Sequence, residues 1–347
     1  MGTMNAKTRG FGGQLPKAEM LLRRTRSSGL RLTALSLVSL LPLLAAAQIP
    51  QPASGRHGDE YTLRLNTDMV VLNASVLDRH NATVSGLEKA NFQIYEDGIQ
   101  QKINHFSHED VPVMVGIAVD NSGSMSSKRN DVIAAAQAFT RLSNPQDQMF
   151  IVNFNDNVTF GLPAGLPFTD RPEQLQLALA EIKAIGQTSL YDGIATALEH
   201  IKLGSRDKKV LILISDGGDN ASKHTLAQVI EMAKQSTAII YAIGIFDEQD
   251  GDQNPAVLKR FAKETGGEAF FPESSRNIVS LCEGIARDIR SQYTLTYTPT
   301  ITSQDGKYRV VDVKAIARSR GHLSVRTRSG YVVPMDTSAS ASKGTRP

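Results

Sequence analysis

The stretch VMVGIAVDNSGSMSSKRN, residues 113–130, determines how the long middle part of this chain folds. Its first half is an uninterrupted apolar run, typical of a strand that is buried on both faces of a sheet. Asp120 ends the run, and two small hydroxyl residues follow at alternate positions, Ser122 and Ser124. The pattern predicts a buried strand, a tight polar loop and then a helix.

Strands and helices alternate in the same way from residue 111 to residue 290, which favours a largely parallel sheet with helices on both faces. The runs KVLILI (209–214) and AIIYAIGI (238–245) fit strands that are buried on both sides. The expected strands are 111–120, 147–156, 208–217, 237–246 and 268–271, and the segment 157–169 is expected to hold a further strand with its connection. The expected helices are 127–143, 171–185, 188–204, 222–236, 254–267 and 274–292.

Two flanking regions, 61–110 and 291–334, instead alternate apolar and polar residues, as half-exposed antiparallel strands do. The second region has too few strands to be stable alone. We therefore expect the two regions to pair into one small β-sandwich, which is split by the α/β domain of residues 111–290. The predicted fold class is α/β, with a doubly wound, mostly parallel sheet inserted in or flanked by that sandwich. The Ser/Ala-rich residues 335–347 are expected to form a disordered tail.

The N-terminal region has the features of an export signal. Residues 1–47 contain a basic stretch, an apolar run from Leu32 and small residues at 45–47 before a cleavage point, and a polar linker, 48–60, follows. The apolar run is about 16 residues, shorter than the roughly 20 that span a bilayer. We expect an exported protein of the periplasm, cell envelope or extracellular space, with a membrane contact only through an uncleaved signal anchor.

Charge and cysteine content narrow the range of partners. Residues 1–47 hold seven of the 38 basic and one of the 35 acidic residues, so that 31 and 34 remain after cleavage. The mature chain is thus weakly acidic, and nucleic acid is not an expected partner. The one cysteine, Cys282, has no intrachain disulfide partner and lies on the apolar side of an expected helix, where we interpret it as a packing residue.

Three polar loops border the expected sheet. One holds Asp120, Ser122 and Ser124, the second holds Thr188 at the start of a helix, and the third holds Asp216 after a buried strand. Ligands of an open α/β sheet bind beyond the carboxyl ends of its strands, near the point where the strand order reverses, so we expect these side chains to converge. They offer hydroxyl and carboxylate oxygens without imidazole or thiolate, a set that suits Mg²⁺ better than zinc.

This constellation resembles the von Willebrand factor A-type (VWA) domain, whose metal-ion-dependent adhesion site reads Asp-x-Ser-x-Ser, then a loop Thr and a loop Asp. The resemblance covers roughly residues 111–290, and all five positions match. The segments 91–106 and 329–334 are also similar to those of exported bacterial proteins with VWA-related domains.

The resemblance implies a bound Mg²⁺, with Mn²⁺ as an alternative, and one or both aspartates binding through water. It also implies an adhesion-type module, because an open metal position that is served mainly by neutral hydroxyls attracts a strong oxygen donor. The expected partner is therefore a protein that donates a carboxylate to the metal.

Simpler roles remain open for the same residues. The Asp120 loop could only cap the following helix, Asp216 could only stabilise its own turn, and Thr188 could only be a helix N-cap. Asp192 is expected on a helix surface, and Asp219 is expected as an outer group beside the site. The arginines at 318, 320, 326 and 328 are expected to share one solvated strand face.

Sequence motifs of other functions are absent. The chain has no Gly-rich phosphate loop, no dinucleotide fingerprint and no G-x-S-x-G elbow. No nucleophile or base stands out beside the expected metal, so enzymatic activity is not expected. Two alternatives to the binding module are a structural envelope protein with a vestigial metal site and a metal-dependent phosphate-ester hydrolase.

Overall fold

The computed structural model describes residues 69–141, 144–180, 183–246, 251–273, 277–303 and 305–335, all within one compact unit, 64–347. The expected export signal and linker, the first residues of the expected sandwich, and the expected tail beyond Met335 lie outside the described residues. Among the residues that the structure describes, no helix is both long enough and apolar enough to cross a bilayer.

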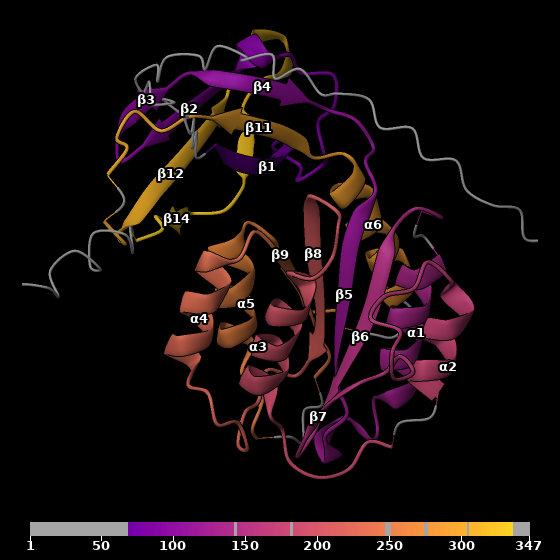
Figure 1. Cartoon of the computed structure of the whole chain (residues 1–347). Helices are drawn as coiled ribbons and strands as arrows, with labels where there is room; N and C mark the ends of the chain where they lie inside the picture. Colours follow the sequence, from indigo (N-terminus) through magenta and orange to yellow (C-terminus); the bar gives the residue numbers. More distant parts are fainter. Residues whose placement is uncertain are drawn as a thin grey trace, which may run out of the picture. The chain divides into compact units, whose positions relative to one another are not determined.

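The central sheet contains six described strands in the order β10-β9-β8-β5-β6-β7 (Figure 1). Every pair is parallel except β6 with β7. The chain runs from β5 to β6 and later returns on the other side of β5 as β8, so the strand order reverses between β5 and β8. The strands are β5 (Val113–Asp120), β6 (Gln148–Phe154), β7 (Val158–Phe160), β8 (Lys208–Ser215), β9 (Ile239–Gly244) and β10 (Ala269–Phe270).

Helices cover both faces of this sheet (Figure 1). All residues of β5 and β9 are buried, which agrees with the continuous apolar runs in their sequence. One face carries α1 (Arg129–Arg141), α2 (Pro172–Ala180) and α6 (Ile278–Arg290), and the other carries α3 (Leu190–Ile201), α4 (Leu226–Gln235) and α5 (Pro255–Thr265).

Cys282 is buried in α6 with its Sγ 3.4 Å from the Ala135 carbonyl oxygen, and burial raises its pKa to about 12.

The β-sandwich consists of two antiparallel sheets, and each draws strands from both sides of the α/β domain. Their orders are β13-β1-β11-β4 and β14-β12-β2-β3. A second apolar core fills the space between them, so the predicted fold class, an α/β domain inserted in a split sandwich, is confirmed. The strands are β1 (Val70–Leu77), β2 (Phe92–Glu96), β3 (Ile99–Gln101), β4 (Ile103–Ser107), β11 (Tyr293–Tyr297), β12 (Tyr308–Ala315), β13 (Ser324–Arg326) and β14 (Gly330–Val332), with a 3-10 turn, η1 (Lys89–Asn91), before β2.

The segment 157–169 contains a short strand and its connection, as the sequence pattern predicts. Only β7 is a strand there, and an isolated bridge between Thr169 and Met149 follows it. Pro163 and Pro167 lie between the two, and proline lacks the N–H that a ladder requires.

The expectation of one solvated arginine face is wrong. Arg318 and Arg320 lie in an exposed 3-10 turn, η4 (Arg318–Arg320), while Arg326 pairs with acidic side chains of the α/β domain. Arg328 donates to the carbonyl oxygens of Gly330 and Lys234 at 2.7 and 2.6 Å. The cause is that Arg326, at the end of short β13, lies beside the largely buried Asp288, and Arg328, just beyond β13, lies beside main-chain oxygens, so both side chains find partners instead of water.

Lys208, the first residue of β8, is buried, and the effect of this burial on stability can be tested by changing the pH. Burial lowers the pKa of Lys208 to about 8, although Asp288 and Asp110 act to raise it, and its ammonium donates to the Ile289 carbonyl oxygen. The folded chain therefore binds fewer protons than the unfolded chain between pH 8 and the ordinary lysine value of 10.5, so the free energy of unfolding rises with pH across this window.

We expect this group to add about 2 kcal/mol to the free energy of unfolding between about pH 7.5 and pH 9.5. Lys208→Met should remove that gain, whereas a surface substitution, Lys102→Met, should keep it. Urea denaturation of all three proteins at both pH values measures the difference. Equal pH slopes for the wild type and Lys208→Met would contradict the prediction.

Candidate metal centre

Asp120 lies at the end of β5, beside the end of β8, because the two strands are parallel neighbours. The Ser215 hydroxyl donates to Asp120 Oδ2 at 2.6 Å, and the Ser122 backbone N–H donates to Oδ1 at 2.9 Å. Asp120 is only 1% exposed, and burial is the main cause that raises its pKa to about 6, against the hydrogen bonds from Ser122 and Ser215. The negative charge of Asp216 raises this pKa further, so an ionised Asp120 here favours a nearby cation.

Ser122, Ser124 and Asp216 form a continuous polar contact beside Asp120. The two serine hydroxyls are 3.1 Å apart, at the start of the 3-10 turn η2 (Gly123–Met125). Ser124 Oγ donates to Asp216 Oδ2 at 2.8 Å, which joins the loop after β5 to the loop after β8. The Asp216 Oδ1 atom also accepts the Gly218 N–H at 3.1 Å, so Asp216 both stabilises its turn and faces the first loop.

The loop before α3 is fastened to the Asp120 loop through the backbone. The Gly123 N–H donates to the Gly186 carbonyl oxygen, and the Ile185 N–H donates to the Asn121 carbonyl oxygen, each at 3.0 Å. Gly186 has φ +85°, and a Cβ there would lie 1.8 Å from Asp156 Oδ2. The left-handed backbone at this position therefore favours glycine, while the Asp156 side chain could move aside for a Cβ.

Thr188 lies in that fastened loop, between the other two. Its N–H donates to Asn220 Oδ1 at 2.8 Å, and its carbonyl oxygen accepts the Asn220 N–H at 3.0 Å, which ties it to the loop that contains Asp216. In the described part of the chain, the Thr188 hydroxyl makes no hydrogen bond to the other four predicted side chains. The N-cap of α3 is Ser189, so helix capping does not explain Thr188.

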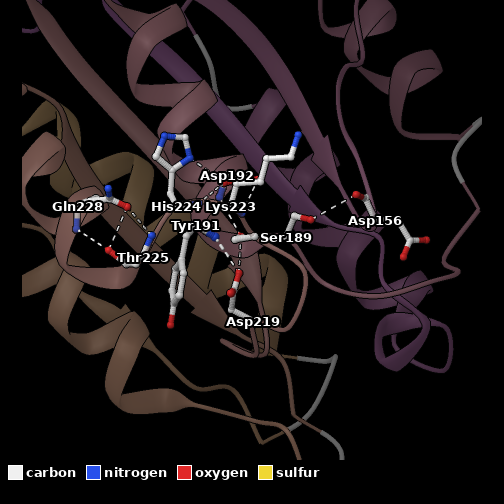
Figure 2. Close-up of polar contacts among 10 residues, drawn as sticks. Asp156, Ser189, Tyr191, Asp192, Asp219, Lys223, His224, Thr225 and Gln228 are labelled. Atoms are coloured by element: carbon white, nitrogen blue, oxygen red, sulfur yellow. Dashed lines mark hydrogen bonds and ion pairs between the residues drawn. The ribbon is translucent and has the colours of Figure 1, made fainter.

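Two further aspartates hold the start of α3 against the segment 219–225 (Figure 2). Asp219 Oδ1 accepts the Tyr191 N–H at 3.1 Å. The Asp192 carboxylate accepts the N–H groups of Lys223 and His224 at 3.0 and 2.9 Å and lies 2.7 Å from His224 Nδ1. The described hydrogen bonds of Asp219 are with Tyr191 and Ser222, so its role as an outer group of the site stays a prediction. Asp192 is not merely a helix-surface residue, because a distant loop packs onto its side chain.

Sequence reasoning missed three polar residues of this centre. Ser215 and Asn220 flank Asp216 in the run SDGGDN, so a local signal for them existed. No local signal marked Lys128, because it lies in the polar run SSKRN, which is typical of an exposed segment. In the fold it is 5% exposed, and its Nζ lies 3.5 Å from Asp216 Oδ2.

The side chains present fit a hard divalent cation. Hydroxyl and carboxylate oxygens from Asp120, Ser122, Ser124 and Asp216 are gathered, and the Thr188 loop adjoins them. No cluster of three or more His, Cys, Asp or Glu side chains suited to a metal occurs among the described residues. Mg²⁺ and Mn²⁺ accept such oxygen donors together with water, whereas structural zinc sites use thiolate and imidazole.

Together, the reversal of strand order, the buried aspartate and the two serines define a doubly wound α/β domain with an oxygen-lined loop site. Residues 115–283 match the family model of the von Willebrand factor type A domain, and this part of the chain is a domain of that family.

Comparisons with other known proteins show only distant likeness. A von Willebrand factor type A protein from Catenulispora acidiphila has 14% identity and a TM-score of 0.45, covering 78% of this chain and 75% of that one. An aerotolerance-related membrane protein from Bacteroides fragilis has 17% identity and a TM-score of 0.42, covering 51% and 98%. The mussel byssus proximal thread matrix protein 1, with a zinc-occupied MIDAS motif, has 18% identity and a TM-score of 0.42, covering 52% and 49%. No curated protein sequence matches.

Proposed function

We propose that this protein is an exported binding module that holds Mg²⁺ at Asp120, Ser122, Ser124, Thr188 and Asp216 and engages an acidic side chain of a partner protein. The observation that carries the proposal is the 2.8 Å contact between Ser124 Oγ and Asp216 Oδ2, because it brings donors from two distant loops together beside buried Asp120. The family match of residues 115–283 supports the same reading.

The chemistry of the proposed site follows from its donors. A bound Mg²⁺ supplies an electrophilic position for one oxygen of an incoming carboxylate. The serine and threonine hydroxyls are neutral, so they would not offset the positive charge of the ion. That charge would be offset by Asp120, Asp216 and the carboxylate of the ligand. Asp216 accepts the Ser124 hydroxyl, and Asp120 accepts the Ser122 N–H and the Ser215 hydroxyl, so the two aspartates hold the first loop in place through hydrogen bonds.

The proposal includes export and a non-enzymatic role. The domain limits proposed with it are signal 1–47, linker 48–60, sandwich halves 61–110 and 291–334, VWA domain 111–290 and tail 335–347. Ser124 donates to Asp216 at 2.8 Å, but in this proposal both side chains serve the metal, so we do not favour the phosphate-ester hydrolase.

One observation favours a second candidate, a structural envelope protein with a vestigial metal site. Lys128 already places a positive charge 3.5 Å from Asp216 Oδ2. A lysine in this place offers the carboxylates a counter-charge that does not depend on any ion in solution.

Calorimetry with the mature chain distinguishes the two candidates. We expect Mg²⁺ and Mn²⁺ to bind with a Kd of about a millimolar or tighter. Asp120→Ala should abolish the binding, because it removes the carboxylate that orders the first loop, while the exposed control Asp312→Ala should bind as the wild type does. Absence of heat from either ion at about ten times that concentration would favour the vestigial site.

Capture from the native envelope then tests the partner. Proteins retained by the wild type with Mg²⁺, and lost both with a chelator and with Asp120→Ala, are the metal-dependent partners. We expect such a partner to lose binding when one acidic residue of its contact surface is changed to the amide. A partner that is retained equally by the wild type and Asp120→Ala would contradict engagement through the metal.

A further inference from the structure

Lys128 is the buried cation of this centre, and its backbone is held in a defined place. Its N–H donates to the Met125 carbonyl oxygen at 3.2 Å, and its own carbonyl oxygen accepts the N–H groups of Asp131 and Val132 at 2.9 and 3.1 Å. These bonds fix it at the junction of η2 and α1. The side chain is 5% exposed and reaches back from this junction to Asp216.

The next residue shows that this orientation is specific to Lys128. Arg129 directs its guanidinium away from Asp216, donating to Asn121 Oδ1 at 2.9 Å and to the Leu179 carbonyl oxygen at 3.1 Å. In the described loop 121–129, the basic side chain that contacts the Asp216 carboxylate is therefore that of Lys128.

The carboxylate oxygen that Lys128 contacts is also the one joined to the serine loop. Asp216 Oδ2 lies 3.5 Å from Lys128 Nζ and accepts the Ser124 hydroxyl at 2.8 Å. A divalent ion among Ser122, Ser124 and Asp216 would share this carboxylate with the ammonium group. Like charges at such short separation in a buried site repel strongly, since little water screens them.

We propose that Lys128 is an internal counter-ion that competes with the divalent cation and so sets the Mg²⁺ concentration at which the site loads. This inference rests on the proposed function. Without metal, the ammonium offsets one of the two buried carboxylates and stabilises the closed arrangement of the loops. With metal, the same ammonium opposes the ion and lowers its affinity.

Lys128 also changes the net charge that a partner meets. Two carboxylates and one ammonium leave the metal-free site with one net negative charge, and a divalent ion converts this to one net positive charge. With a neutral residue in place of Lys128 the loaded site would be neutral. The lysine therefore weakens metal binding and strengthens the preference of the loaded site for an acidic ligand.

The test uses the full mature chain and the metal alone. We expect Lys128→Met to lower the Kd for Mg²⁺ about tenfold, which corresponds to about 1.4 kcal/mol. We also expect it to lower the metal-free melting temperature and to enlarge the stabilisation by saturating Mg²⁺. Lys128→Arg should behave like the wild type, because it keeps the charge, and the exposed Lys102→Met is the matched control. Lys128→Gln should shift the Kd in the same direction as Lys128→Met, which guards against a packing defect of one variant.

Each outcome of the Mg²⁺ titrations supports or overturns the role of Lys128. Tighter Mg²⁺ binding by both neutral variants, or binding by these variants when the wild type shows none, supports the counter-ion. Wild-type binding that is unchanged or weakened in both neutral variants overturns the role of Lys128 and leaves the proposed function intact. Absence of binding in the wild type and in both neutral variants overturns both proposals.

Discussion

Asp216→Asn is expected to weaken Mg²⁺ binding by about a hundredfold or more. Asparagine keeps the size of the side chain but removes the negative charge that faces Ser124 and Lys128. An amide placed there would turn either an N–H group or a single weaker acceptor toward the lysine. Calorimetry with Mg²⁺ measures the loss, and Asp312→Asn at an exposed position of β12 is the control. A Kd within about threefold of the wild type would remove Asp216 from the proposed ligand set.

The same substitution should also destabilise the metal-free protein. The substitution takes away the carboxylate that Lys128 contacts at 3.5 Å, and breaking a buried pair costs about 3 kcal/mol. Adding Lys128→Met to Asp216→Asn should recover part of that cost, because the ammonium that had faced Asp216 is then removed. A double-mutant cycle from urea denaturation gives the coupling between the two residues, and additive effects would show that they do not interact.

Arg326→Met is expected to lower the free energy of unfolding by about 3 kcal/mol. Arg326 on β13 pairs with Asp288 on α6 and with Glu268, which precedes β10. The Asp288 side chain is 10% exposed and also accepts the Tyr241 hydroxyl at 2.6 Å. Removal of the guanidinium takes away the cation that contacts this buried carboxylate and leaves Lys208 as the positive charge that still acts on it, so the cost arises in the α/β domain although the substitution is in the sandwich.

Chemical denaturation measures this loss, and Arg318→Met in the exposed turn η4 is the matched control, with an expected change within about 0.5 kcal/mol. Adding Asp288→Asn to Arg326→Met should restore part of the stability. A loss below about 1 kcal/mol for Arg326→Met would indicate that water or another cation compensates Asp288.

The fold could be predicted far into its details because the signals for it are local. Continuous apolar runs in 113–119 and 209–214 indicated strands covered on both faces, and the structure has β5 and β8 there as parallel neighbours. The shortage of strands after residue 291 indicated pairing across the insertion, and β11 does pair with β1. The segment 157–169 was expected to hold a strand and its connection, but the residue at which β7 ends was not predicted, because the effect of the prolines depends on which backbone groups the neighbouring strand offers.

Part of the candidate site could also be predicted from the sequence, and part depended on the tertiary structure. Asp120, Ser122 and Ser124 were visible as one motif, and Thr188 and Asp216 as polar residues beside expected elements of the sheet. The contact between Ser124 and Asp216 required the strand order, which puts β8 beside β5. The contact of Ser215 with Asp120 follows from the register of those two strands.

The sequence was sufficient for the elements, the split sandwich and the oxygen-bearing loops, since apolar periodicity and turn residues act over short stretches of chain. The charged contacts of Lys128 and Arg326 could be seen only in the tertiary structure. Lysine and arginine are usually solvated, and nothing in their immediate neighbours shows that a carboxylate 88 residues away, or one on the last helix, will be buried beside them. Burial of a charge depends on the whole packing, and the packing joins residues whose sequence separation hides their proximity.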